Sequence, residues 1–296
     1  MCPSCSVAMT YHTKKRDYSD GHLVCHWCGK KMPPPRVCPT CQSEHLARMG
    51  FGTQRVEEEL EKLLPSASIL RMDTDTTGTK LAYDNLLGVF RRHEADVLLG
   101  TQMVTKGHDF PDVTLVGVLL ADASLYLDDY RANERTFSML TQVIGRAGRG
   151  EKEGLAVIQT NNPDSEVIRL ACEQNYEAFY EREIRLRKLL TVPPFCDIAL
   201  VTVTGLLESE LLLAVARLAK DLEDLNSGTY RDVPLISFGP FEAPVYRVDN
   251  RYRMRIVIKC KLNKRTLEML SALVTGFASN VGKRLNISID LNPSSL

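Results

Sequence analysis

The amino-acid sequence predicts an α/β protein with a mostly parallel sheet, preceded by a zinc-ribbon-like cysteine-rich region and followed by an α+β domain. Three observations carry this prediction. Six of the nine cysteines form Cys-x-x-Cys pairs within residues 1–44. Strand-like and helical patterns alternate over residues 45–192. Residues 193–296 have the pattern of a split β-α-β module.

The cysteine pairs of residues 1–44 have the spacing of zinc ligands. Two thiolates separated by two residues suit adjacent corners of a zinc tetrahedron, and two such pairs complete it. The 19 residues between Cys5 and Cys25 lie within the usual zinc-ribbon range. A disulfide framework is the alternative, but it needs an oxidising compartment for which the sequence offers no signal. We therefore predict metal ligation by Cys2, Cys5, Cys25, Cys28, Cys38 and Cys41.

The middle of the chain alternates between strand and helix. Apolar, β-branched runs predict strands at 45–49, 68–72, 96–101, 114–121 and 155–160. Helical spacing predicts helices at 54–64, 79–93 and 132–144, and a helical region at 165–190. This alternation implies a mostly parallel sheet that is covered on both faces.

Two segments of this α/β region have residues suited to phosphate chemistry. Residues 100–110 follow a predicted strand with glycines, a hydroxyl, an amide and a cation, where ligands gather in open α/β sheets. Residues 142–150 place Arg146 and Arg149 three positions apart, where a helical pattern runs into glycine. Arginine offers phosphate oxygens a planar fork of donors. The alternative is a plain helix end with arginines near its carbonyl groups.

These two segments resemble motifs V and VI of superfamily 2 helicases, and residues 50–57 resemble their motif IV region. With the cysteine pairs, the resemblance narrows to the PriA family of replication-restart helicases. It covers essentially the whole chain, but only the carboxyl-terminal part of such a protein. The resemblance implies that residues 45–192 form the second RecA-like lobe of an ATP-dependent 3′–5′ DNA helicase. Such an enzyme recognises stalled or forked DNA and restarts replication by primosome assembly.

The resemblance also implies catalytic roles. Arg146 and Arg149 would act as arginine fingers toward the γ-phosphate of ATP, and Gln142 would orient phosphate or water. These roles require a first lobe, since an interlobe site closes only when both halves are present.

Four residues of the segment after the strand would link ATP to DNA. Gly107 and Asp109 would couple nucleotide binding to DNA, and Thr101 and Lys106 would contact the DNA backbone. ATP and Mg²⁺ are expected only together with the first lobe.

The phosphate loop of such a lobe is not found in this sequence. No Gly-x-x-x-x-Gly-Lys-Ser/Thr motif occurs, and no Asp-Glu-x-His segment follows a strand. We therefore expect the chain to be part of a longer protein or a fragmentary reading frame, and to be inactive alone as an ATP hydrolase.

The family pattern of four cysteine pairs implies an uneven pair of zinc sites. The pairs Cys2/Cys5 and Cys25/Cys28 match the inner two, which share one zinc ion. The last pair, Cys38/Cys41, matches half of a second site whose other pair is missing. His22, His26 or His45 is an alternative ligand for that half site. The lone cysteines, Cys172, Cys196 and Cys260, are expected in cores.

Beyond a boundary at Pro193, the pattern predicts strands at 198–204, 235–238, 252–261 and 287–291, and helices at 209–225 and 264–280. Basic residues are concentrated in this module. By the alternation of strand side chains, Arg253 and Arg255 share one face, and Lys259 and Lys261 continue it. A stripe of cations fits single-stranded or forked DNA. The predicted DNA-binding residues are Arg247, Arg251, Arg253, Arg255, Lys259 and Lys261.

Two alternatives for this stripe stay open. It could bind an acidic protein tail, and the resemblance implies such a partner in single-strand DNA-binding protein, beside other primosome and helicase-loading proteins. It could also be ordinary protection of an edge strand by Lys and Arg. The whole chain could accordingly be a non-catalytic zinc and DNA-binding module, or a protein-interaction module.

Composition limits these options only weakly. The 37 basic and 37 acidic residues give a formal net charge of zero, so DNA binding has to depend on local patches. No apolar run reaches transmembrane length and no signal peptide opens the sequence, so we expect a cytoplasmic protein without membrane partners.

Overall fold

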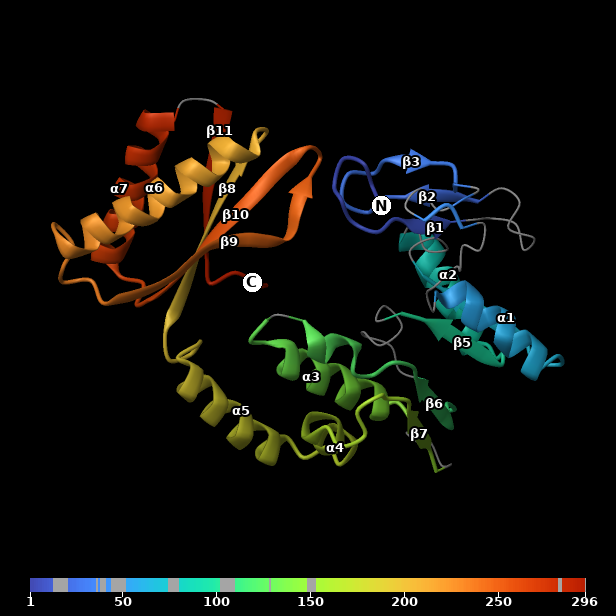
Figure 1. Cartoon of the computed structure of the whole chain (residues 1–296). Coiled ribbons are helices and arrows are strands. Elements are labelled where there is room, and N and C mark those ends of the chain that lie inside the picture. Colours follow the sequence, from blue (N-terminus) through green and yellow to red (C-terminus); the bar gives the residue numbers. More distant parts are fainter. Residues whose placement is uncertain are drawn as a thin grey trace. The chain divides into compact units, whose positions relative to one another are not determined.

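The computed structural model describes residues 1–12, 21–35, 37, 41–43, 52–73, 80–101, 110–127, 129–147, 153–281 and 284–295. The chain divides into two compact units (Figure 1). One unit joins Met1–Arg48 to Leu186–Leu296, and the other is Met49–Arg185. The cysteine-rich region and the carboxyl-terminal segment, which the sequence predicts as separate domains, therefore share one unit.

The cysteine-rich region is built on a small antiparallel sheet. Its strands β1 (Thr10–His12), β2 (His22–Val24) and β3 (Lys31–Met32) pair in chain order. The cysteine pairs flank these strands, because one pair precedes β1 and the other lies between β2 and β3. The short strands thereby bring two pairs that are distant in sequence to one end of the sheet.

The rest of this unit is a four-stranded antiparallel sheet with two helices. Its elements are β8 (Asp197–Gly205), α6 (Glu208–Ser227), β9 (Leu235–Val248), β10 (Arg251–Cys260), α7 (Lys264–Val281) and β11 (Leu285–Leu291). The strands pair in the order β11-β8-β10-β9, so β9 and β11 are the edges. The sequence of elements agrees with the predicted split β-α-β order.

Both helices cover the same face of this sheet, as Figure 1 shows. Side chains along a strand point alternately to its two faces, so every second residue of β8 and β10 faces the helices. These residues are Ala199, Val201, Val203, Met254, Ile256, Ile258 and Cys260. The helices complete the core with Leu211, Val215, Leu218, Leu222, Met269, Leu270, Leu273 and Phe277. Each such buried side chain stabilises the fold by about 1.5–3 kcal/mol. The opposite face of the sheet is left free of α6 and α7.

Strand β9 is longer than predicted because it continues through Gly239 and Pro240. The sequence pattern ends a strand at this pair, since proline and glycine usually interrupt strands. In the structure the two residues form a bulge against β10: Phe238 pairs with Val257, and Phe241 pairs with Arg255. Gly239 has a φ of 107°, and an added Cβ would lie 2.9 Å from the carbonyl oxygen of Arg255. Glycine is therefore required here.

The second unit contains two parallel strand pairs, β4 (Ile69–Met72) with β5 (Val97–Gly100) and β6 (Leu115–Val118) with β7 (Leu155–Ile158). Parallel pairing was predicted for these four strands, but within the described ranges the two pairs are not joined into one sheet. The strand predicted at 45–49 lies outside the described residues. The remaining elements are α1 (Thr53–Leu63), α2 (Lys80–Arg91), a 3-10 turn η2 (Ala123–Tyr126), α3 (Ala132–Ile144), α4 (Glu166–Cys172) and α5 (Tyr176–Leu190).

The core of this second unit lies between α3 and the helices that follow β7. Phe137 and Phe179 stack with ring centroids 4.0 Å apart, and Leu140 is fully buried beside them. The helical region predicted at 165–190 is two helices, because Gln174 adopts a φ of 52° and ends the first one. Among the described residues, no helix is long and apolar enough to cross a membrane.

Candidate functional site

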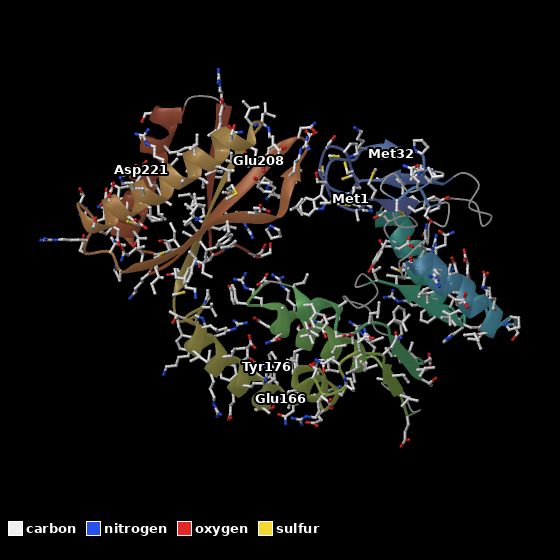
Figure 2. All side chains as sticks on the ribbon, in the orientation of Figure 1. Met1, Met32, Glu166, Tyr176, Glu208 and Asp221 are labelled. Carbon is white, nitrogen blue, oxygen red and sulfur yellow. The ribbon has the colours of Figure 1, made fainter. Side chains whose placement is uncertain are left out.

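Four cysteine sulfur atoms lie together in the cysteine-rich region. The thiols of Cys2, Cys5, Cys25 and Cys28 are all within 4.8 Å of one another. The sulfur atoms of Cys2 and Cys28 are 3.7 Å apart, close to the ~3.8 Å edge of a tetrahedron with Zn–S bonds of about 2.3 Å. Figure 2 shows sulfur atoms, in yellow, gathered in the region between Met1 and Met32. The donor set and its spacing fit a structural zinc ion.

Each cysteine pair is held by the same kind of tight turn. The Ser6 N–H donates to the Cys2 carbonyl at 2.8 Å, and the Gly29 N–H donates to the Cys25 carbonyl at 2.8 Å. Ser6 and Gly29 follow the second cysteine of each pair, and both have positive φ, 55° and 72°. The left-handed residue folds the chain back, so both thiols of a pair point to the same side.

Burial and backbone donors act differently on the individual thiols. Burial alone would raise the pKa of Cys25, but the N–H groups of Cys28 and Trp27 and neighbouring thiols outweigh it and lower the pKa to about 7. Burial raises the pKa of Cys5 to about 12, against an opposing hydrogen bond from Asp249. One thiol of this site is thus stabilised as a thiolate, and burial keeps another protonated. A bound cation would lower the pKa of all four thiols and release their remaining protons.

The cysteine cluster is packed against the turn between β9 and β10. The Asp249 N–H donates to the Cys5 sulfur at 3.2 Å, and the Asn250 N–H donates to the Ser4 carbonyl at 2.9 Å. Val248 packs on the buried cysteines. A cavity of about 260 Å³ lies beside this contact, lined by Cys5, Ser6, Val7, Pro244, Val245, Tyr246, Arg247 and Tyr252. The carboxyl-terminal domain therefore supplies part of the environment of the predicted zinc ligands.

The predicted half site is only partly described. Cys41 is exposed and Cys38 lies outside the described residues. Of the alternative ligands, His45 is also outside them. His26 lies 3.3 Å from His12, measured between their Nε2 atoms, so it is engaged within the cysteine-rich region. A second metal site thus stays a prediction.

The prediction for the lone cysteines is wrong for one of them. Cys260 is buried in the sheet core and Cys196 is half-buried, but Cys172 is exposed. Cys172 is the last residue of α4, and the helix presents its Leu170 and Ala171 to the core instead. The apolar surroundings in sequence did not indicate which side of this short helix faces inward.

Helix α3 positions the predicted arginine finger. Phe137, Leu140 and Val143 bury one face of α3, and the helix ends at Gly145, whose N–H donates to the Thr141 carbonyl at 3.0 Å. Arg146 follows in a half-buried turn, and Gln142 is exposed one helical turn earlier. An added Cβ at Gly145 would lie 3.2 Å from the same carbonyl oxygen. Gln142 lies in the last turn of the helix, and Arg146 lies just beyond its end.

The strand-end segment is described only at its start. Thr101 is exposed directly after β5, at the carboxyl end of the strand, as predicted. Gly107, Asp109, Lys106 and Arg149 lie outside the described residues. Asp73, at the same end of β4, accepts a hydrogen bond from the Thr53 hydroxyl at 2.6 Å and pairs with Arg71 at 3.3 Å. Its role here is to hold the start of α1.

The predicted basic stripe is less uniform than its sequence suggests. Arg251 and Lys261 are exposed, but Arg255 is buried, with 9% of its surface exposed. The Lys259 ammonium donates to the Leu190 carbonyl at 2.6 Å. Arg255 lies on the central strand β10, with Phe241 and Thr202 as its cross-strand neighbours.

Arg247 and Arg253 complete the stripe. The Arg247 guanidinium donates to the Asn250 side chain at 2.9 Å and lies over the Tyr252 ring at 5.3 Å. Arg253 is half-buried on the same face as Arg255. Beside the stripe, β9 exposes Phe238 and Phe241. The predicted strand ends at residue 238, so the sequence pattern did not place Phe241 in the same strand as Phe238.

Three family descriptions match successive parts of the chain. Residues 2–33 match the PriA DNA helicase Cys-rich region, residues 30–151 the helicase conserved C-terminal domain, and residues 188–294 the primosomal protein N C-terminal domain. The first and third matches fall in one compact unit and the second covers most of the other.

The chain is similar along its whole length to curated replication restart proteins PriA. It is 44% identical to that of Bacillus subtilis over 293 residues, which covers 99% of this chain and 35% of the relative. It is 40% identical to the Synechocystis protein over 262 residues, which covers 87% of this chain and 30% of the relative. It is 33% identical to the Borreliella burgdorferi protein over 297 residues, which covers 100% of this chain and 43% of the relative. The chain thus spans less than half the length of these relatives.

Proposed function

We propose, since this chain belongs to the PriA family of replication restart proteins, that it forms part of an ATP-dependent 3′–5′ superfamily 2 DNA helicase. The whole protein would recognise stalled or forked DNA and restart replication by primosome assembly. The observation that carries this proposal is the sequence similarity along the whole chain, which includes all three family matches in order. The polarity of translocation is taken from the family resemblance.

In this function, residues 45–192 would serve as the second RecA-like lobe. The parallel strand pairs, the exposed Thr101 at a strand end and Arg146 at the end of α3 support this assignment. Arg146 and Arg149 would stabilise the charge on the γ-phosphate of an ATP whose phosphate loop is carried by another lobe. No phosphate-loop sequence occurs in these 296 residues, so the chain alone would not hydrolyse ATP.

One zinc ion would be held by Cys2, Cys5, Cys25 and Cys28. A structural zinc bound by four thiolates supplies folding free energy and no open coordination position for chemistry. The small core of the cysteine-rich region, which consists mainly of these cysteines with Val7 and Met9, supports such a role. Cys38 and Cys41 would form half of a second site.

The proposed partners are forked or single-stranded DNA, single-strand DNA-binding protein and helicase-loading proteins. The cations of β9 and β10 would contact DNA phosphates, and counterion release would make this binding salt-dependent. The domain division proposed is 1–44, 45–192 and 193–296, with the outer two packed into one unit.

Fork binding tests this proposal. The zinc-loaded chain is titrated into fluorescently labelled forked DNA, single-stranded DNA and blunt duplex, with polyglutamate as a competitor of the same charge. We expect the fork and the single strand to bind more tightly than the duplex, and polyglutamate to bind more weakly than either of them. Equal affinity for polyglutamate, or no affinity for any DNA at low salt, would contradict the proposal.

A further inference from the structure

The face of the four-stranded sheet opposite α6 and α7 has two partly exposed phenylalanines. Phe238 is 43% exposed and Phe241 is 37% exposed, and Ile236 on the same edge strand is 56% exposed. Single exposed apolar side chains are ordinary, but three along one edge strand form an apolar surface, and basic side chains lie beside it.

The bulge at Gly239 and Pro240 brings the two rings to one face. In a regular strand, residues three apart point to opposite faces. Here three steps along β9, from Phe238 to Phe241, match two steps along β10, from Val257 to Arg255. Because Val257 and Arg255 share a face, their partners do so too. The bulge therefore turns the Phe241 side chain to the face on which Phe238 lies.

Cations stand beside both rings. The Lys259 ammonium lies 5.0 Å from the centre of the Phe238 ring, and the Arg255 guanidinium carbon lies 6.0 Å from the centre of the Phe241 ring. Arg253 is two residues further on the same face of β10. Rings flanked by cations are suited to bases joined by phosphates.

Small polar side chains on β8 and β11 lie in the same cross-strand rows as these cations. The register aligns Phe241, Arg255, Thr202 and Ser288 in one row. The next row contains Arg253, Thr204 and Asn286, and Asp290 lies on the same face of the far edge strand β11. Hydroxyl and amide groups both donate and accept hydrogen bonds, as base edges require. An acidic peptide offers its carboxylates as acceptors, which this mixed set matches less well.

We propose that this sheet face binds unpaired single-stranded DNA, with bases stacked on Phe238 and Phe241 and phosphates near Lys259 and Arg253. The inference rests on the proposed DNA-binding function and adds the residues and the mode of contact. The rings select strands whose bases are free to unstack, because a base in a duplex cannot present its face to them.

The test compares a double variant with the unchanged chain. The zinc-loaded chain, Phe238→Leu/Phe241→Leu and the control Tyr180→Leu, whose ring is 51% exposed on α5, are titrated with a labelled oligo(dT) of about 12 nucleotides. Leucine keeps the apolar contacts and removes the rings. We expect roughly tenfold or more weaker binding for the double variant, with an unchanged salt slope, and no change for the control. An unchanged affinity of the double variant would overturn the inference and leave the proposed function standing.

Two further arms separate other outcomes. An oligonucleotide with 5-iododeoxyuridine should photo-cross-link to the peptide that contains residues 235–248, and cross-links confined to other peptides would overturn the inference. A polyglutamate peptide that loses affinity for the double variant, while oligo(dT) does not, would reassign the face to an acidic protein. Failure of the unchanged chain to bind any DNA at low salt would overturn the inference and the proposed DNA-binding function together.

Discussion

The backbone N–H of Asp249 donates a hydrogen bond to the sulfur atom of Cys5 at 3.2 Å. These residues are far apart in sequence, yet the hairpin turn that begins at Asp249 reaches the cysteine cluster. A sulfur that accepts a backbone N–H is stabilised as a thiolate, which is the form that ligates zinc. The carboxyl-terminal sheet and the metal site are thus linked, and loss of either should weaken the other.

Metal content is the first prediction. We expect about one zinc ion per chain, because the cluster of Cys2, Cys5, Cys25 and Cys28 is complete. Cys25→Ser should abolish zinc retention and lower the melting temperature, whereas the exposed Cys172→Ser should change neither. Atomic absorption of the dialysed proteins measures the content. A value near two would contradict the prediction that the second site is incomplete, and full retention by Cys25→Ser would refute the assigned ligand set.

The turn between β9 and β10 gives a second prediction. Asp249 and Asn250 both have positive φ, 47° and 61°, as a two-residue hairpin turn requires. Asn250→Gly and Asn250→Ala both remove the side-chain contact with Arg247, but only alanine is strained in this conformation. Alanine should be about 1 kcal/mol less stable than glycine. It should also release zinc faster to a chromogenic chelator. Equal release from the two variants would show that the turn does not support the metal site.

Asp197 gives a pH-dependent prediction. Its carboxylate accepts hydrogen bonds from the Leu262 N–H and the Asn292 side chain, both of which lower its pKa. Stability from a lowered carboxyl pKa is present above its ordinary value and is lost as the pH falls through the lowered value. Asp197→Ala should destabilise the domain by about 1–2 kcal/mol at pH 7. The difference in the free energy of urea unfolding between the two proteins should shrink as the pH falls below about 3.9, the ordinary carboxyl pKa. A difference that stays constant throughout the acid range would contradict this origin.

Salt dependence is the fourth prediction. Arg253→Ala should reduce the salt slope of single-stranded DNA binding by about 0.7, the loss expected for one phosphate contact. Arg217→Ala is the matched control, because Arg217 is an exposed arginine on α6, which covers the other face of the sheet. Anisotropy titrations at several salt concentrations give the slopes. Equal slopes for the two variants would mean that the β10 face does not meet phosphate.

Much of the fold followed from local patterns. Helix α3 begins and ends where the apolar spacing and Gly145 predict, and the Cys-x-x-Cys spacing identified the four clustered ligands. The break in the helical region was missed because Gln174, a residue that rarely adopts positive φ, forms it.

The misses at the candidate sites have a common cause, because tertiary structure overrode a local signal. Proline at position 240 usually ends a strand, but a bulge carries β9 past it and aligns Phe238 with Phe241. The link between Asp249 and Cys5 joins two segments that no spacing rule connects. The burial of Arg255 likewise depends on neighbours from other strands, which the spacing of charges along the sequence does not show.

ATP hydrolysis measures the central claim most directly. The zinc-loaded chain is assayed with forked DNA and without DNA, beside Arg146→Ala and Arg149→Ala variants. We expect fork binding and no DNA-stimulated hydrolysis by any of the three proteins, because the phosphate loop has to come from another lobe. DNA-stimulated hydrolysis by the unchanged chain that either arginine substitution abolishes would contradict the account, since it would require a complete nucleotide site within these residues.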